Sequence, residues 1–273
     1  MTGGDFWVAM PLATLLAGAF VVHLVARLMT KKNQWLALLT SLIFALALVW
    51  QGYTVRMSRA LSPTDPLPPA WGSFLPGGTA LNAGPGDIYM AGIALGLGLC
   101  AAIYSGRYLS MDHRYQTFYP LLLLLIAGLV GMVMATDLFS LYLFTELMSV
   151  TAYALVAFRR RSGTAVEAGF KYLVMGSAGT LTLLMGIALF YRSTGSVALG
   201  QPVQAASIWG RASVACMFVG FAIKSAIVPA HTWLPDAYER APSTIASLSG
   251  IVTPGVFYAL IKVTLSSGYP PER

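Results

Sequence analysis

The sequence predicts an all-α fold, that of a polytopic membrane protein with about eight transmembrane helices. Its 273 residues are 57% hydrophobic and 10% charged, with a mean hydropathy of +0.70, whereas a soluble domain carries about 25% charged residues. Apolar runs of about 20 residues, each long enough to cross a roughly 30 Å hydrocarbon layer, recur along the chain. We expect spans at residues 6–27, 35–55, 88–109, 118–136, 138–158, 168–191, 212–231 and 243–266.

The first three spans form a predicted N-terminal part, residues 1–110. The first apolar run lacks the basic start of a signal peptide and is long enough to span, so we interpret it as a helix. A polar segment at residues 56–87 joins the second and third spans. Its prolines and glycines predict a long, extended outer loop rather than a domain. We expect no soluble domain.

The remaining five spans lie in residues 111–273, and the seventh of the eight is predicted to be broken. Every span must be helical, because lipid offers no hydrogen-bond partner to a free backbone amide. Lys224 lies deep in the seventh span, and Pro229 follows it. A proline frees backbone carbonyls of the preceding turn. Such breaks are tolerated at membrane depth where they line a cavity or are buried in protein.

The basic residues of the loops predict the orientation. Cytoplasmic loops carry an excess of Lys and Arg, so the richer set of loops should face the cytoplasm, with both termini outside a bacterial-type plasma membrane. This pattern also explains the net charge of +7, so we expect no nucleic-acid partner. Loops after odd-numbered spans hold nine basic residues and the others hold four: Arg27, Lys31, Lys32, Arg107, Arg114, Arg159, Arg160, Arg161 and Arg240, against Arg56, Arg59, Arg192 and Arg211.

We recognise no catalytic motif in this sequence. Cys100 and Cys216 lie inside apolar runs without a metal-ligand spacing, and we interpret them as small apolar side chains. We find no nucleotide-binding loop, no haem or cluster motif and no activated nucleophile. We therefore expect no catalytic site, cofactor or metal in this chain.

Apart from Arg27 and Arg107 at span ends, four charged residues lie inside the predicted spans: Glu146, Lys171, Lys224 and Lys262. An ionised side chain at mid-bilayer costs at least about 2.5–3.5 kcal/mol on insertion scales, and such residues usually mark a function. Lys171, near the start of its span, and Lys262, late in its span, can also snorkel to the nearest surface.

Glu146 and Lys224 carry the central hypothesis. Tyr142, Ser149 and Tyr153 share the helical face of Glu146, which gives a polar stripe that should point into the bundle. Burial favours the neutral forms of a lysine and a carboxylate, while an opposite charge nearby favours the charged forms. A lysine whose carboxylate partner approaches or withdraws therefore takes up or releases a proton. The alternative is a static ion pair between the fifth and seventh helices.

Two long motifs give the sequence a family resemblance. The stretch DLFSLYLFTELMSVTAYALVAF resembles the fifth-helix signature of the antiporter-like, proton-translocating subunits of complex I, Mrp-type cation/proton antiporters and membrane-bound hydrogenases. GFAIKSAIVPAHTWLPDAYERAPSTIASL resembles the seventh-helix lysine of that family with the loop that follows it, and AGFKYLVMGS its sixth-helix lysine motif. The resemblance covers about residues 85–265.

The resemblance implies roles for these residues. Glu146 and Lys224 match the coupling pair, and Lys171 matches the lysine that modulates or relays. Protons reach the lysine through a water-filled half-channel, driven by redox chemistry in partner subunits or by exchange against a cation. Family members usually have about fourteen helices with two inverted five-helix repeats. Helices four to eight here match the first repeat, so the implied partners are other membrane subunits, one of them a chain that supplies the second repeat, or the chain is a split or truncated member.

The eighth span departs from the family pattern. The family places a lysine or histidine at its middle, where this chain reads SLSGIVTPGVFY, with Ser247 and Thr253 as hydroxyls able to hold water. Lys262 lies about two turns further on, so the role is not transferred to it.

Loop and terminal residues complete the candidate set. His231 and Asp236 belong to the loop motif, as relay candidates or as loop packing and helix capping. Asp137 and Asp87 open the fifth and third spans, and we interpret both as helix caps.

Three functional hypotheses follow. The first is a proton-translocating membrane subunit of a multisubunit complex. The second is a structural or assembly half-subunit without transport activity of its own. The third is an independent secondary transporter formed as a homo-oligomer. The sequence leaves open the type of complex, and also whether protons or sodium ions are coupled.

Overall fold

Eight long helices and one short helix make up the part of the chain that the computed structural model describes, which is residues 6–28, 33–60, 81, 84–109, 115–158, 162–201 and 207–266. The long helices coincide with the eight predicted spans, which confirms the all-α membrane fold. Seven of them are long and apolar enough to cross a membrane. The elements are α1 (Phe6–Leu28), α2 (Asn33–Ala60), α3 (Pro85–Tyr108), α4 (Tyr115–Met134), α5 (Leu138–Val156), α6 (Gly163–Thr194), α7 (Ile208–Lys224), α8 (Trp233–Arg240) and α9 (Ser243–Ser266).

Some predicted boundaries differ from the observed ones. Helix α2 continues to Ala60, so the first residues of the predicted 56–87 loop are helical. Helix α3 begins at Pro85, where proline suits the first turn because its missing N–H would have no partner there. Most of the predicted loop and the arginine cluster at 159–161 lie outside the described residues. The division at residue 110 and the orientation in the membrane stay predictions.

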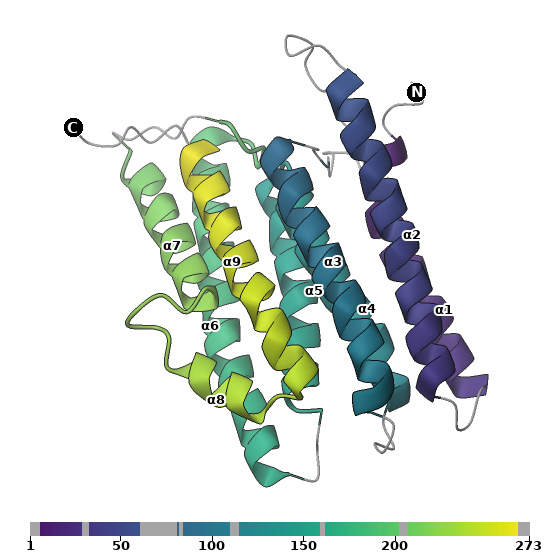
Figure 1. Ribbon diagram of the computed structural model, residues 1–273. Coiled ribbons are helices and arrows are strands. Elements are labelled where there is room, and N and C mark those ends of the chain that lie inside the picture. Colours follow the sequence, from purple (N-terminus) through teal and green to yellow (C-terminus); the bar gives the residue numbers. More distant parts are fainter. Residues whose placement is uncertain are drawn as a thin grey trace.

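Successive helices run up and down the bundle, with α1 and α2 on one side, α6 and α7 on the other and α9 in front of the centre (Figure 1). Helix α4 contacts α1, α2, α3, α5 and α9. It is buried along nearly its whole length, as expected for a helix that is apolar all round. The core of the bundle is therefore centred on α4, beside the helix that carries Glu146.

Glycines bring the helices of the candidate site close together. A Cβ atom at Gly220 of α7 would lie 2.8 Å from the carbonyl oxygen of Gly179 and 2.8 Å from the amide of Leu183, both on α6. A Cβ at Gly128 of α4 would lie 2.6 Å from the amide of Met148 on α5. Small residues allow such backbone approach between membrane helices. The sequence thereby fixes α5 and α7, which carry Glu146 and Lys224, against their neighbours.

The seventh helix is broken, as predicted, but its first part ends earlier than expected. Helix α7 stops at Lys224, and the short helix α8 begins only at Trp233. The indole Nε1 of Trp233 donates a 3.0 Å hydrogen bond to the carbonyl oxygen of Ile223. The same carbonyl also accepts a 3.2 Å bond from the amide of Ala226, just beyond the end of the helix, so Trp233 adds a second partner at the break. The break thus places Lys224 at a helix end inside the bundle.

The two acidic residues interpreted as caps behave differently. Asp137 caps α5, because its side chain accepts a 2.7 Å hydrogen bond from the amide of Ser140. Gly84, and not Asp87, occupies the capping position of α3. Asp87 lies in the first turn, and its carboxylate pairs with Lys262 of α9. The cap prediction for Asp87 was therefore wrong.

Candidate functional site

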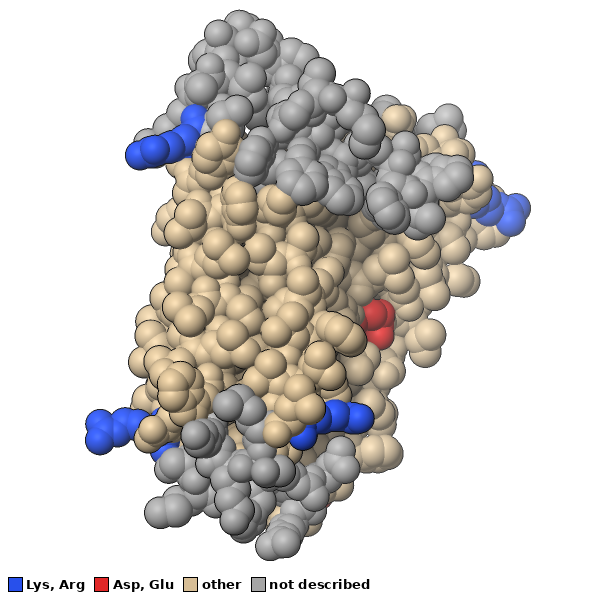
Figure 2. Space-filling model, turned by 90° about the vertical axis from the view of Figure 1, so that its right-hand side faces the viewer, with Lys and Arg blue, Asp and Glu red and all other residues tan. Residues whose placement is uncertain are grey.

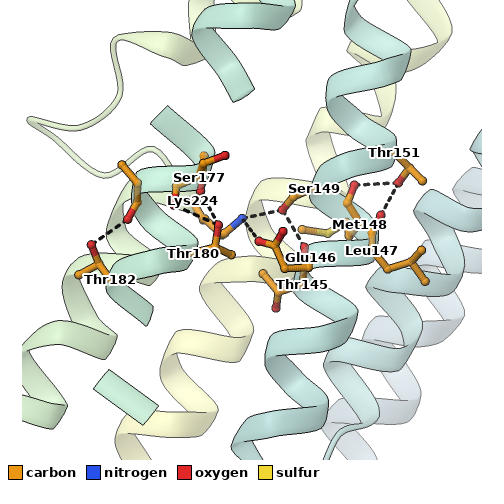
Figure 3. Close-up of polar contacts among 12 residues, drawn as sticks. Thr145, Glu146, Leu147, Met148, Ser149, Thr151, Ser177, Thr180, Thr182 and Lys224 are labelled. Atoms are coloured by element: carbon orange, nitrogen blue, oxygen red, sulfur yellow. Dashed lines mark hydrogen bonds and ion pairs between the residues drawn. The ribbon is translucent and has the colours of Figure 1, made fainter. Parts of the chain in front are cut away.

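Lys224 places a buried ammonium group between α7 and α5. Its side chain is 3% exposed. The Nζ atom donates a 2.7 Å hydrogen bond to Oγ of Ser149 and lies 3.8 Å from Oε1 of Glu146. Figure 3 shows the lysine extending toward these two α5 side chains. Glu146 and Ser149 lie three positions apart on one helix and so present their side chains to the same neighbour.

The carboxylate of Glu146 lies near the ammonium of Lys224 without a direct hydrogen bond to it. At 3.8 Å, Oε1 is beyond hydrogen-bond distance, and this buried atom has no hydrogen-bond partner among the described residues. The direct bond goes to a neutral hydroxyl instead. The ammonium thus has a neutral hydroxyl at hydrogen-bond distance and a carboxylate just beyond it.

Hydroxyl groups line the face of α5 toward this site. Ser149 donates a 2.7 Å hydrogen bond to the carbonyl oxygen of Thr145, and Thr145 donates a 2.6 Å bond to that of Leu141. The hydroxyl proton of Ser149 is thus engaged along the helix, which leaves its oxygen to accept from Lys224. The helix itself orients the acceptor.

Aromatic rings cover the break beside Lys224. Tyr172 of α6 stacks on Trp233, with ring centroids 4.2 Å apart and an interplanar angle of 4°. Tyr153 of α5 meets Tyr172 edge to face at 4.6 Å. Tyr172 and Trp233 did not enter the sequence prediction. Their positions in the sequence could have indicated them, because Tyr172 follows Lys171 directly and Trp233 lies within the stretch HTWLPDA.

Glu146 is also partly open to the outside of the chain. Its side chain is 33% exposed, on a face of α5 that exposes apolar residues: Phe139, Leu143 and Val150. Figure 2, a view from the α1 and α2 side of the bundle, shows that the middle of this face is largely uncharged and that basic side chains lie toward its two ends. The pair of Glu146 and Lys224 is therefore asymmetric, with a buried cation and a partly accessible anion.

Lys171 lies elsewhere, together with Asp236. Its Nζ atom is 2.9 Å from Oε1 of Glu167 and 3.0 Å from Oδ2 of Asp236, and its side chain is 50% exposed. These residues line a cavity of about 90 Å³ with Thr164, Ala168 and Arg240. The structure thus brings two predicted site residues together at the α8 end of the bundle. No contact with Glu146 or Lys224 is present among the described residues.

The remaining candidates lie apart from the pair. His231 is exposed in the loop before α8. The hydroxyl of Thr253 lies 3.1 Å from that of Tyr238, which joins α9 to α8. Lys262 pairs with Asp87 at 2.9 Å, near the end of α9 that lies away from α8. The side chain of Ser247 lies outside the described part of the chain.

Known proteins share both the sequence and the fold. The profile of the family described as NADH:quinone oxidoreductase/Mrp antiporter, transmembrane region, matches residues 135–268. Subunit N of NADH-quinone oxidoreductase from Desulfitobacterium hafniense is 37% identical over 169 residues, which are 60% of this chain and 34% of the relative. Subunit N 2 from Symbiobacterium thermophilum is 29% identical over 269 residues, which are 91% of this chain and 50% of the relative. The chain thus spans between a third and a half of the length of these relatives.

Solved structures of membrane complexes contain the same helical arrangement. A chain of the Mrp complex from Dietzia superposes with a TM-score of 0.84 at 23% identity, covering 98% of this chain and 50% of that one. A chain of respiratory complex I from Thermus thermophilus superposes with a TM-score of 0.73 at 25% identity, covering 93% of this chain and 53% of that one. These similarities confirm the antiporter-like fold. Together with the match over residues 135–268, the relatives make this chain similar in sequence to membrane subunits of the NADH:quinone oxidoreductase/Mrp antiporter family.

Proposed function

We propose that this chain is a proton-translocating subunit of a multisubunit membrane complex, with Glu146 and Lys224 as its proton-handling pair. The observation that carries the proposal is the ammonium of Lys224, 3% exposed, bonded to a neutral hydroxyl and 3.8 Å from a carboxylate. A structural ion pair gains most from direct hydrogen bonds between its charges. Because the ammonium and the carboxylate are not directly bonded at this site, we infer that the protonation state of the pair can change.

The proposed step transfers one proton at a time. While Glu146 is ionised, its negative charge favours a protonated Lys224. When a proton from outside the chain neutralises Glu146, the ammonium keeps only the hydroxyl of Ser149 as partner. The buried cation then loses its electrostatic support, and Lys224 passes a proton onward. The proton of Glu146 then passes to the neutral Lys224, which restores both charges and completes the transfer of one proton across the pair.

The surroundings of Glu146 support a partner chain on this side of the bundle. A carboxylate at membrane depth faces a protein interior or a water-filled cavity and not lipid. The side chain of Glu146 is 33% exposed among apolar neighbours on α5. We infer that another membrane subunit, such as one that supplies a second repeat, covers this face in the assembled complex.

The location in the cell is part of the proposal. We place the chain in a bacterial-type plasma membrane with both termini outside. The α8 end of the bundle is then cytoplasmic, so the cavity of Lys171 and Asp236 opens toward the proton source. In this arrangement Lys171 modulates proton entry and does not touch the central pair.

Neutralising the pair tests the proposal. In the complex purified with its own partners and placed in liposomes, Lys224→Met and Glu146→Gln should each abolish proton translocation while the complex still assembles. Glu239→Gln is the matched control, because its carboxylate is 67% exposed and does not line the cavity of Lys171. Normal proton flux in the Lys224→Met complex would falsify the proposal. Impaired assembly with normal flux per assembled complex would favour a structural half-subunit.

The identity of the ion needs its own measurement. We propose the proton, so flux should persist when sodium is replaced by choline at constant pH. A strict dependence on sodium would instead identify sodium as a coupled ion.

A further inference from the structure

We propose that Asp87 and Lys262 form a permanently charged clamp that fixes α9 against α3 and α4 and thereby positions the helices of the central pair. Only this last step, the effect on Lys224 and Glu146, rests on the proposed function. The clamp makes Lys262 a positioning residue and not a proton carrier.

The contacts of Lys262 join three helices. Its Nζ atom on α9 lies 2.9 Å from Oδ1 of Asp87 on α3 and 2.7 Å from the carbonyl oxygen of Val133 on α4. The hydroxyl of Tyr258, one turn earlier on α9, donates a 2.8 Å hydrogen bond to the same Oδ1 atom. The side chains of Asp87 and Lys262 are 5% and 18% exposed. Each charge is thus both paired and hydrogen-bonded, as burial requires.

The backbones around the clamp are shaped to admit it. A Cβ atom at Gly86 would lie 2.7 Å from the hydroxyl of Tyr258, so a larger residue there would require this side chain to shift. A Cβ at Gly255 of α9 would collide with the side chain of Leu129 on α4. The two glycines therefore leave room for the side chains that pack around Lys262 and Asp87.

The distances around Lys262 differ from those around Lys224. Short, direct bonds are expected of a charge that stays fixed, and a longer separation is expected of one that changes. Lys224 has its carboxylate at 3.8 Å, whereas Lys262 has its carboxylate at 2.9 Å and a second oxygen at 2.7 Å. Removing one partner of a buried pair leaves an uncompensated charge. The direct bonds of Lys262 to Asp87 and to Val133 favour a single arrangement of the three helices, as expected for a clamp.

Helix α9 connects the clamp to the central pair. It contacts α5 and α7, which carry Glu146 and Lys224. Pro254 interrupts its hydrogen-bond ladder, because proline has no N–H to donate. The helix is held on both sides of this point, by Thr253 bonded to Tyr238 of α8 and by Tyr258 and Lys262 bonded to Asp87. Loss of the second anchor frees the part of α9 beyond the proline to shift beside α5 and α7.

Two substitutions at Lys262 distinguish a clamp from a proton carrier. Arginine stays protonated at every accessible pH and keeps the hydrogen bonds. In the complete complex we expect Lys262→Arg to translocate protons within about twofold of the wild type, because its charge is retained. Lys262→Met should lower turnover at least roughly tenfold, since small displacements far from the reacting groups can cost up to a hundredfold. The Michaelis constant for the driving substrate should not change, because the clamp lies apart from any substrate site.

Two results would overturn the clamp. If Lys262→Arg is as slow as Lys262→Met, the lysine must release its proton and acts as a carrier. If Lys262→Met turns over normally, the contacts have no positioning role.

A thermal-unfolding cycle tests the clamp without any transport. Asp87→Asn and Lys262→Met should each lower the melting temperature of the complex, and the double variant should lower it by clearly less than their sum. Purely additive shifts would show that the two residues are not coupled, which contradicts the clamp. A coupled cycle together with normal flux in Lys224→Met would refute the proposed function and leave the clamp in place.

Discussion

Lys224 donates its short hydrogen bond to Ser149 and not to Glu146: Nζ lies 2.7 Å from the serine hydroxyl and 3.8 Å from the glutamate carboxylate. The cation is therefore held by a neutral group within reach of an anion. A hydroxyl of this kind keeps the ammonium solvated without fixing it in an ion pair. Ser149 thus takes part in the proposed proton step together with the two charged residues.

Removal of this hydroxyl should slow transport. In Ser149→Ala the ammonium loses its acceptor, and a hydrogen bond to a charged group contributes about 1.5–3 kcal/mol. We expect Lys224 either to lock onto Glu146 or to remain under-solvated, and the proton-translocation rate to fall about tenfold or more. The rate in reconstituted complexes is the measurement. Ser140→Ala is the control, because that hydroxyl on the same helix is buried without a hydrogen-bond partner among the described residues, and it should leave the rate unchanged.

The two partners of the central pair should differ in their effect on stability. Glu146→Gln leaves a cation that is 3% exposed without its counter-charge, and such a loss typically costs about 3–5 kcal/mol. Lys224→Met leaves a carboxylate that is 33% exposed and partly solvated, so it should cost less. The double variant should recover much of the stability and none of the transport. Chemical unfolding of the purified complex checks this order, and equal losses for the two single variants would contradict it.

Much of the fold follows from the sequence because a membrane helix is specified locally. Apolar runs of sufficient length predicted the eight long helices. The end of α7 was misplaced because the apolar sequence continues past Lys224 through Ala226, Ile227 and Val228, so hydropathy does not register the break. Pro229 indicates that a break exists but lies downstream of it. The break itself depends on tertiary contacts, among them the bond from Trp233 to Ile223.

The candidate site was only partly predictable for a similar reason. Glu146, Ser149 and Lys224 were found through helical periodicity and motif resemblance. The pairing of Asp87 with Lys262 was not, because the two residues are 175 positions apart and each resembled an ordinary helix-end charge. Lys171 was predicted either to lie at membrane depth or to snorkel toward the nearest surface, and its partners are Glu167, one turn earlier, and Asp236. Only the first of those partners could be seen from helical spacing.

Gly220 should tolerate no side chain. Its Cβ would lie 2.8 Å from backbone atoms of α6, so Gly220→Ala must push α6 and α7 apart, one turn before Lys224. Overpacking of this kind typically costs about 1–3 kcal/mol. We expect a lower melting temperature and reduced turnover, because Lys224 moves with its helix. Gly96→Ala in α3 is the matched control, since nothing lies within 4 Å of the added atom, and it should be neutral or slightly stabilising.

Trp233 should be needed for its indole N–H as well as for its ring. Trp233→Phe keeps an aromatic surface for Tyr172 but removes the donor to the carbonyl oxygen of Ile223. The carbonyl then keeps only its 3.2 Å bond from the amide of Ala226, and the loss of a typical hydrogen bond costs about 0.5–1.5 kcal/mol. The end of α7 should then open more readily, which hydrogen exchange of the amides near Lys224 will detect as faster exchange. Trp35→Phe, at a tryptophan that is 57% exposed, should leave that exchange unchanged, and equal exchange in both variants would argue against the cap.

Lys171 should affect transport without affecting stability. Its ion pairs with Glu167 and Asp236 involve side chains that are about half exposed, and such pairs are screened by salt and contribute little to folding. Lys171→Ala should therefore leave the melting temperature of the complex nearly unchanged. If the cavity it lines delivers protons, turnover should fall, and most strongly at high pH, where protons are scarce and local charges matter most for their capture. The pH profile of turnover decides the role: a profile that matches the wild type at every pH removes Lys171 from the proposed entry route.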